Sequence, residues 1–234
     1  MDLNQWSDSL LRETYNKWSS LEGKYEFWKS GFAVFYSPVY ENPDLMIIGY
    51  NPGGDSDTFN EKEALLIPEE HEYFKWNYPL AKKMRETIFN KINKTDLLRK
   101  SIKLNLIFFR SNNKKCFTSI SREVRKDIEQ FCHGKVREII IRLKPKIVIA
   151  EGIKTYDKLK LILKQQPFEF KAETERCSLG NNGRRIYCNI EACKKIDSDV
   201  YCSGYMFLSG LLHLSGARPS EKNLEQFVSA WEMT

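Results

Sequence analysis

The chain has 234 residues, of which 41% are apolar and 29% are charged. This balance excludes a disordered, collagen-like or low-complexity chain, and the length suffices for a core without disulfide or metal staples. No apolar run reaches membrane-spanning length, so a transmembrane protein is excluded. Lys and Arg number 37 against 31 Asp and Glu, and the resulting net charge of +6 favours a polyanionic partner only weakly.

The first predicted element is an amphipathic helix near the N-terminus. One of its faces would carry Trp6, Leu10, Leu11, Tyr15, Trp18 and Leu21. The opening residues lack a basic start followed by an apolar stretch, so we expect no signal peptide. The six cysteines form no CxxC pair. We therefore expect reduced thiols and a cytoplasmic location.

Strands alternate with helices along the rest of the chain. Apolar runs predict strands at 45–49, 104–109, 147–150, 186–190 and 206–212. Helical periodicity and caps predict helices at 80–92, at 124–143 with an interruption near Gly134, through 159–163, and at 223–231. Alternating elements with near-continuously apolar strands are typical of an α/β fold, with helices on both faces of a parallel sheet.

Ligands of such sheets bind beyond the carboxyl ends of the strands. The sequence places polar residues at those positions: Asn51, the segment 105–112, Glu151 and His213. We therefore expect the functional residues to gather at this edge.

Three features at these positions could carry chemistry, although each also has a plain structural explanation. The first is Gly-Tyr-Asn-Pro-Gly-Gly at 49–54, which alone would be a tight turn. The second is His-Leu-Ser-Gly-Ala-Arg-Pro-Ser at 213–220, which alone would be a loop and a helix cap. The third is Asn105, a polar amide within a strand, which is costly there unless it is paired.

Taken together, these features resemble the motifs of the uracil-DNA glycosylase superfamily. In that family a strand followed by Gly-x-(Asp, Asn or Glu)-Pro-Gly precedes an Asn-bearing strand, and a later strand is followed by His-Pro-Ser. The segment Leu-Lys-Pro-Lys-Ile-Val-Ile-Ala-Glu-Gly at 143–152 also fits the family. The resemblance runs from about Asp44 to Trp231. The Asn51 form is most similar to the mismatch-specific and single-strand-selective branches, whereas Leu214 replaces the usual proline.

The resemblance implies a fold and a reaction. The fold would be a three-layer α/β/α sandwich with a central, mostly parallel four-stranded sheet, forming one domain over 1–234 with an N-terminal helical extension of about 1–30. The reaction would be hydrolysis of the N-glycosidic bond of uracil, or of a related modified pyrimidine, flipped out of DNA. The chain would thus be a monofunctional DNA glycosylase of base-excision repair.

The resemblance also assigns roles to individual residues. Asn51 would position the attacking water, and His213 would donate a hydrogen bond to the base carbonyl as charge develops there. Base contacts would come from Gly49, Tyr50, Pro52, Asn105 and the stacking ring of Phe59, for which Tyr73 and Phe74 compete. DNA contacts would come from Arg110, Lys114, Ser215, Gly216, Ala217 and Arg218, with Arg218 in the loop that wedges into the duplex.

No metal or other cofactor is expected. Relatives with an iron–sulfur cluster carry four cysteines, but here no cysteine precedes Cys116, and Phe109 stands where one ligand would be expected. The expected partner is DNA, single-stranded or duplex, with no membrane. We expect a monomer that works at the nucleoid.

Two other functions are compatible with the sequence. The first is a protein of the same fold that binds nucleic acid or a modified base without catalysis, because Asn51 and Leu214 could weaken the site. The second is an unrelated α/β enzyme that binds a phosphorylated ligand at the Gly53-Gly54 turn. The absence of GxGxxG, of GxxxxGK[ST] and of GxSxG argues against this last alternative.

Overall fold

The computed structural model describes residues 1–21, 29–53, 59–111, 117, 119–163 and four later strands, of which only the backbone is described. The elements in chain order are α1 (Leu3–Ser19), β1 (Leu45–Gly49), α2 (Glu61–Ala64), α3 (Glu72–Lys75), α4 (Pro79–Lys82), the π-helix η3 (Lys83–Phe89), α5 (Thr95–Arg99), β2 (Ile102–Asn105), α7 (Arg122–Leu143), β3 (Ile147–Glu151), α8 (Ile153–Leu163), β4 (Phe168–Phe170), β5 (Glu175–Ser178), β6 (Tyr187–Lys195) and β7 (Tyr205–Leu211).

The described strands form one sheet in the order β2-β1-β3-β7-β6-β4, with β5 paired to β6. β1 runs parallel to β2 and β3, and β3 runs parallel to β7. β6 is antiparallel to its three neighbours β7, β4 and β5. The predicted α/β class is confirmed. The sheet is larger than the predicted four strands, because an antiparallel part extends it beyond β7.

The apolar run of β1 explains why helices cover both faces of the sheet. All five residues of β1 are buried. Met46 and Ile48 belong to one core cluster, and Leu45 and Ile47 belong to another. Successive side chains of a strand point to opposite faces, so an uninterrupted apolar run requires a packing partner on each side.

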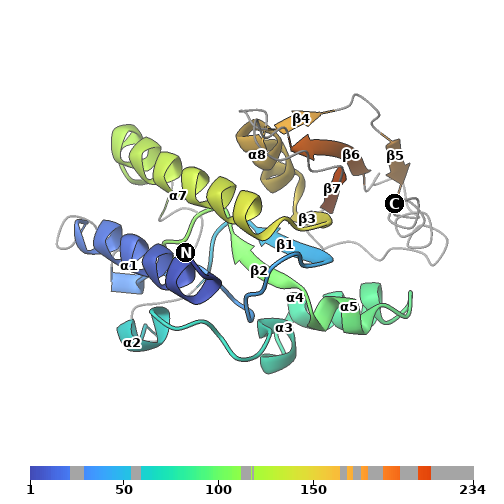
Figure 1. Ribbon diagram of the computed structural model, residues 1–234, viewed down its shortest axis with the longest axis horizontal. Coiled ribbons are helices and arrows are strands. Elements are labelled where there is room, and N and C mark those ends of the chain that lie inside the picture. Colours follow the sequence, from blue (N-terminus) through green and yellow to red (C-terminus); the bar gives the residue numbers. More distant parts are fainter. Residues whose placement is uncertain are drawn as a thin grey trace.

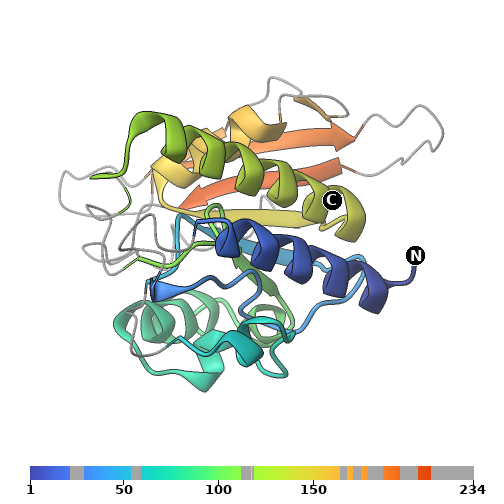
Figure 2. The ribbon, with the colours of Figure 1, turned by 90° about the vertical axis from the view of Figure 1, so that its left-hand side faces the viewer.

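The first face is covered by α1, α7 and α8, whose buried residues share the cluster of Met46 and Ile48. Figures 1 and 2 both show α1 and α7 side by side over the sheet. The two helices are antiparallel: Lys17 pairs with Asp127 at 2.6 Å, while the Trp6 indole Nε1 donates to Glu138 at 2.9 Å. The amphipathic N-terminal helix therefore contributes directly to the core.

α7 is one continuous helix, so the interruption predicted near Gly134 is wrong. The helix begins with a Ser121 cap, and its buried residues include Ile128, Cys132 and Val136 on either side of the glycine. A glycine inside a helix costs only about 1 kcal/mol relative to alanine, which the burial of this face outweighs.

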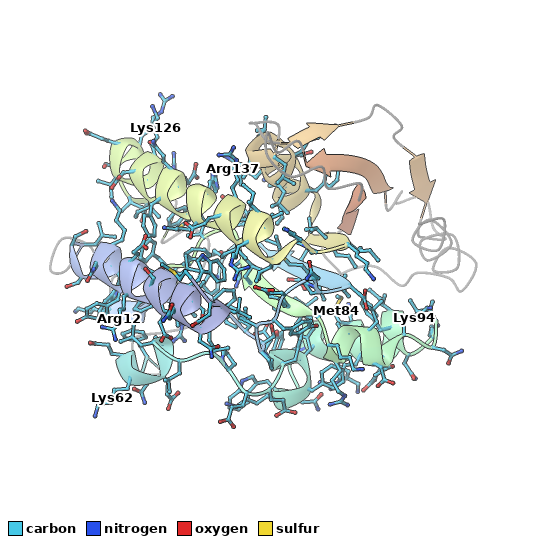
Figure 3. All side chains as sticks on the ribbon, viewed as in Figure 1. Arg12, Lys62, Met84, Lys94, Lys126 and Arg137 are labelled. Atoms are coloured by element: carbon cyan, nitrogen blue, oxygen red, sulfur yellow. The ribbon has the colours of Figure 1, made fainter. Side chains whose placement is uncertain are left out.

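The second face is covered by α3, α4, η3 and α5. In Figure 3 the labelled Met84 lies among the side chains between η3 and the sheet, whereas Lys126 of α7 points outward. Met84 is fully buried with Leu45 and Ile47. The helix predicted at 80–92 is therefore confirmed in place, although it is divided into α4 and a π-helix.

The strand predicted at 104–109 is shifted: β2 covers Ile102–Asn105. Beyond it the chain stays buried but leaves the regular ladder. Leu106 and Ile107 donate their amides to the carbonyls of Gly49 and Tyr50, and Phe109 forms an isolated bridge with Phe32. The apolar run therefore indicated burial rather than strand pairing.

The remaining predictions differ in outcome. The strands at 147–150 and 206–212 are confirmed within one residue as β3 and β7, and the strand at 186–190 extends to Lys195 as β6. The helix predicted at 223–231 lies outside the described residues. In the described part of the chain, no helix combines the length and hydrophobicity needed to span a bilayer.

Candidate functional site at the carboxyl edge of the sheet

A cavity of about 790 Å³ opens at the carboxyl edge of the parallel strands. β1 is followed by α3, α4, η3 and α5 on the second face, whereas its neighbour β3 is followed by α8 on the first face. The connections therefore diverge between β1 and β3, which is the point where α/β sheets leave a crevice. The lining residues are Tyr36, Gly49, Tyr50, Asn51, Pro52, Gly53, Glu72, Tyr78, Leu80, Lys103, Asn105, Glu151, Gly152, Lys154 and Thr155.

Five of the residues that the sequence assigned to base binding and catalysis line this cavity, namely Gly49, Tyr50, Asn51, Pro52 and Asn105. Glu151, expected at the same edge, lines it as well. Arg110 lies beside the first turn, where its Nε donates to the Gly53 carbonyl at 3.3 Å. The structure thus brings together side chains from the ends of β2 and β3 and from the turn that follows β1.

Phe59 is placed elsewhere. Its ring packs against Trp18 at 5.1 Å and Phe32 at 6.0 Å between ring centroids. It also lies directly against Gly31, where a Cβ would overlap the ring. Phe59 therefore belongs to the aromatic group beside α1 and not to the cavity lining.

Several predicted residues lie outside the described part of the chain: Lys114, His213, Ser215, Gly216, Ala217 and Arg218. The last described residue before His213 is Leu211, at the end of β7. Leu211 is in register with Glu151 of β3, at the edge where the cavity opens.

Asn51 is held by its amide nitrogen. Nδ2 donates to Ser111 Oγ at 2.8 Å and contacts the Pro52 carbonyl at 3.4 Å, and the Ser111 amide donates to that same carbonyl at 3.2 Å. Because the nitrogen is committed to these acceptors, the amide oxygen is the atom that can accept a hydrogen bond from a water or ligand in the cavity.

Asn105 lies on β2 directly beside Gly49, its partner in the ladder. A Cβ at position 49 would overlap Asn105 Oδ1, and would lie only 3.0 Å from Glu151 Oε2 and 3.2 Å from Lys103 Nζ. The glycine of the first motif therefore has a packing role: it makes room for the polar side chains of the two neighbouring strands.

A buried ionic cluster joins the cavity wall to the sheet. Lys103 Nζ lies 2.8 Å from Glu151 Oε2 and 3.7 Å from Glu72 Oε1. The Tyr73 hydroxyl donates to the other oxygen of Glu151. The side chains of Lys103, Glu151 and Glu72 are 3%, 9% and 17% exposed, so access to the cavity increases in that order.

Burial shifts the protonation of this cluster. The pKa of Glu151 is raised well above its ordinary value by burial and then by the charge of Glu72. Burial also raises the pKa of Glu72, against the opposing charge of Lys103, and lowers the pKa of Lys103. Each group is thus shifted towards its neutral form, as is typical of functional sites with close carboxyl groups.

Tyrosines form the aromatic part of the wall. The cavity is lined by Tyr36, Tyr50 and Tyr78. The Tyr36 hydroxyl is buried and interacts with the side chain of Asn105. Burial and the charge of Glu72 raise the pKa values of both Tyr36 and Tyr78, so both remain protonated and can donate.

Two further residues position the wall. Arg85 of η3 donates to the carbonyls of Tyr73 and Trp76 and to Asn77 Oδ1, which fixes the segment leading to Tyr78. His71 caps α3, accepting the Tyr73 amide at Nδ1, so its Nε2 carries the hydrogen donated to Ser101 Oγ. Burial, with the nearby charges of Lys103 and Arg99, lowers the pKa of His71 to about 3.

The sequence prediction missed Lys103, Glu72, Tyr36 and Tyr78. Lys103 did carry a signal, because a charged residue inside a buried strand and two positions before Asn105 must share its face. Tyr36 precedes β1 and Glu72 lies between β1 and β2, so both reach the site only through tertiary packing. The Tyr36 amide donates to the Lys103 carbonyl, and the Glu72 amide donates to the Tyr36 carbonyl, both at 2.8 Å.

Cys132 lies on the buried face of α7, within the core. Burial raises the pKa of its thiol to about 12. Among the described residues, no group of three or more His, Cys, Asp or Glu side chains is placed to hold a metal ion.

Neither a scan against protein-family models nor a search of curated proteins found a match to the chain.

Proposed function

We propose that the protein is a monofunctional DNA glycosylase that hydrolyses the N-glycosidic bond of a modified pyrimidine, or of uracil, flipped out of DNA. The observation that carries the proposal is that Asn51 and Asn105, selected from separate sequence motifs, line one cavity at the switch point of the sheet. A nucleobase extruded from a duplex requires such a pocket, lined by aromatic rings and amides.

The chemistry follows from the groups present. Asn51 accepts a hydrogen bond from the attacking water through Oδ1, but an amide cannot remove its proton near neutral pH. Water attacks the sugar carbon as the bond to the base breaks, and negative charge develops on the departing base. The proton that the attacking water loses passes to the base anion or to solvent water, which balances the hydrolysis. Asn105 can donate and accept, as reading a pyrimidine edge requires. His213 is proposed, from the resemblance alone, to stabilise the developing oxyanion.

The distribution of charge supports a nucleic-acid substrate. Exposed Lys154 lies on the rim of the cavity, and Arg110 lies beside the Gly53 turn, where both could contact phosphates. The interior instead carries the carboxyl groups of Glu72 and Glu151. An anionic phosphate is disfavoured there, which argues against a small phosphorylated ligand bound inside.

The test is a screen of labelled oligonucleotides, single-stranded and duplex, that contain uracil or modified bases, followed by alkali to cleave abasic sites. We expect product with the wild type, its loss in Asn51→Ala and His213→Ala, and unchanged product in Asn4→Ala, an exposed amide on α1. Tight DNA binding without product would support the non-catalytic alternative. No DNA binding at low salt would exclude both.

A further inference from the structure

Glu72 is the carboxyl group of the cavity best placed to meet a ligand. Glu151 is engaged on both oxygens, by Lys103 at 2.8 Å and by the Tyr73 hydroxyl. Glu72 lies farther from Lys103, at 3.7 Å, and its side chain is more exposed than that of Glu151. Glu72 also accepts a hydrogen bond from the Tyr78 hydroxyl, but a carboxylate has about four acceptor positions, so Glu72 retains acceptor capacity towards the cavity, whereas Glu151 serves mainly as the counterion of Lys103.

The balance of groups in the interior indicates which ligand chemistry fits. Among the described residues that line the cavity, Glu72 and Glu151 carry largely buried carboxyl groups, and Lys103 carries the one largely buried ammonium group. An uncompensated buried carboxylate is costly, and an N–H donor from a ligand would offset that cost. The buried Tyr36 hydroxyl and Asn105 interact on the same wall of the cavity, so a polar ligand there would meet both groups.

We infer that the flipped base carries an exocyclic amino group, as cytosine-type bases do, and that Glu72 accepts a hydrogen bond from that group. This inference rests on the proposed function, which it narrows from pyrimidines in general to amino pyrimidines. Glu72 is then the specificity-determining residue, while Asn105 meets the rest of the base edge.

The physical basis is the difference between an amino group and a carbonyl at the same ring position. In its ionised form, which the charge of Lys103 and the hydrogen bond from Tyr78 favour against burial, the Glu72 carboxylate only accepts. It then attracts the amino group of a cytosine-type base and repels the carbonyl oxygen of the matching uracil-type base. A well-formed contact of this kind is worth about 1–3 kcal/mol of discrimination, or roughly 5- to 150-fold. Glutamine at the same position could donate to the carbonyl and would reverse the difference.

The experiment compares matched bases that differ at this position: 5-hydroxymethylcytosine against 5-hydroxymethyluracil, each in the same oligonucleotide, under single-turnover conditions. We expect the wild type to release the amino base at least about tenfold faster. Glu72→Gln should reduce this ratio about tenfold or more, and Glu72→Asp, which keeps the acceptor, should retain the preference. Glu70→Gln, at an exposed neighbouring position, is the control.

A binding measurement separates this inference from the proposed function. Deoxycytidine and deoxyuridine are titrated into the same variants by NMR. Nucleoside selectivity that Glu72→Gln abolishes, without base release, would support the inference and reject catalysis. Base release with a ratio unchanged in Glu72→Gln would overturn the inference alone. A wild-type preference for the carbonyl base, or neither binding nor release of either member, would overturn it as well.

Discussion

Asn105 Oδ1 occupies the space where the side chain of any residue other than glycine at position 49 would begin. The two residues are partners in the parallel ladder of β1 and β2. The glycine of the first motif and the amide of the second strand therefore form one packing unit, which ties the identity of one motif residue to the position of another.

Gly49→Ala should consequently displace Asn105. We expect a loss of stability of about 1–3 kcal/mol from overpacking, and a larger effect on base release, on the order of 100-fold, because a small displacement of a positioning group is costly. Urea unfolding and single-turnover rates measure the two effects. Gly53→Ala is the matched control, since a Cβ there meets no atom of the described residues within 4 Å. Equal rates in the two variants would contradict this role of Gly49.

Asn51→Asp tests whether residue 51 only orients water. A carboxylate could also take the water proton, and general-base catalysis typically contributes at least about 100-fold, so we expect a rate increase of about tenfold or more near neutral pH. Ser111, which accepts from Asn51 at 2.8 Å, can donate to the new carboxylate through its hydroxyl. A rate in Asn51→Asp as low as that of Asn51→Ala would count against a water at this position.

Lys103→Met should be strongly destabilising. It removes the ammonium group 2.8 Å from Glu151 and leaves that carboxyl buried without its partner, which costs roughly 3–5 kcal/mol. The double variant Lys103→Met/Glu151→Gln should recover part of the loss, because only the more exposed and more distant carboxyl of Glu72 then lacks the ammonium group. Unfolding free energies from urea titrations measure both. A Lys103→Met protein as stable as the wild type would show that the ion pair contributes nothing.

The lowered pKa of His71 predicts that the folded protein loses stability in acid. Its pKa is lowered from 6.5 to about 3 in the folded protein, so between these values the unfolded chain binds a proton that the folded chain does not. Stability is therefore fully present above about pH 6.5 and declines as the pH falls towards 3, by up to about 4 kcal/mol from this residue.

His71→Asn is the variant that isolates this effect. Asparagine can keep the acceptor for the Tyr73 amide at the start of α3 but does not titrate, so the pH dependence of the unfolding free energy should flatten between pH 6.5 and 3. A variant curve parallel to that of the wild type over this interval would assign the acid sensitivity to other groups.

The elements that the sequence predicted well are those in which local pattern and burial agree. β1 is a short apolar run closed by a turn, and its bounds match the prediction. The segment after Asn105 is equally apolar, but β2 ends at Asn105. Leu106 and Ile107 instead pair irregularly with the chain around Gly49 and Tyr50. Hydrophobicity indicates burial but does not specify the hydrogen-bond partner.

The residues of the candidate site also differ in how far the sequence could predict them. Asn51 and Asn105 were predictable, because polar residues at or just beyond the ends of apolar strands have few structural uses. Glu72 was not, since it follows His71 in a short helix whose place depends on backbone contacts with the segment around Tyr36. Such contacts join residues distant in the chain, and no local pattern in the sequence encodes them.

On the second face of the sheet, the same strands carry core residues and then cavity residues. Leu45, Ile47 and Ile149 lie in the apolar core, and Gly49 and Glu151 follow them at the cavity. Moving the strand-borne groups relative to one another would require breaking the sheet. Glu72 and Tyr78, in contrast, come from the segment that Arg85 fixes from outside the sheet. Under the proposed function, divergence towards new bases would therefore proceed by remodelling that segment, while the turn around Asn51 and its strand neighbours stay constant.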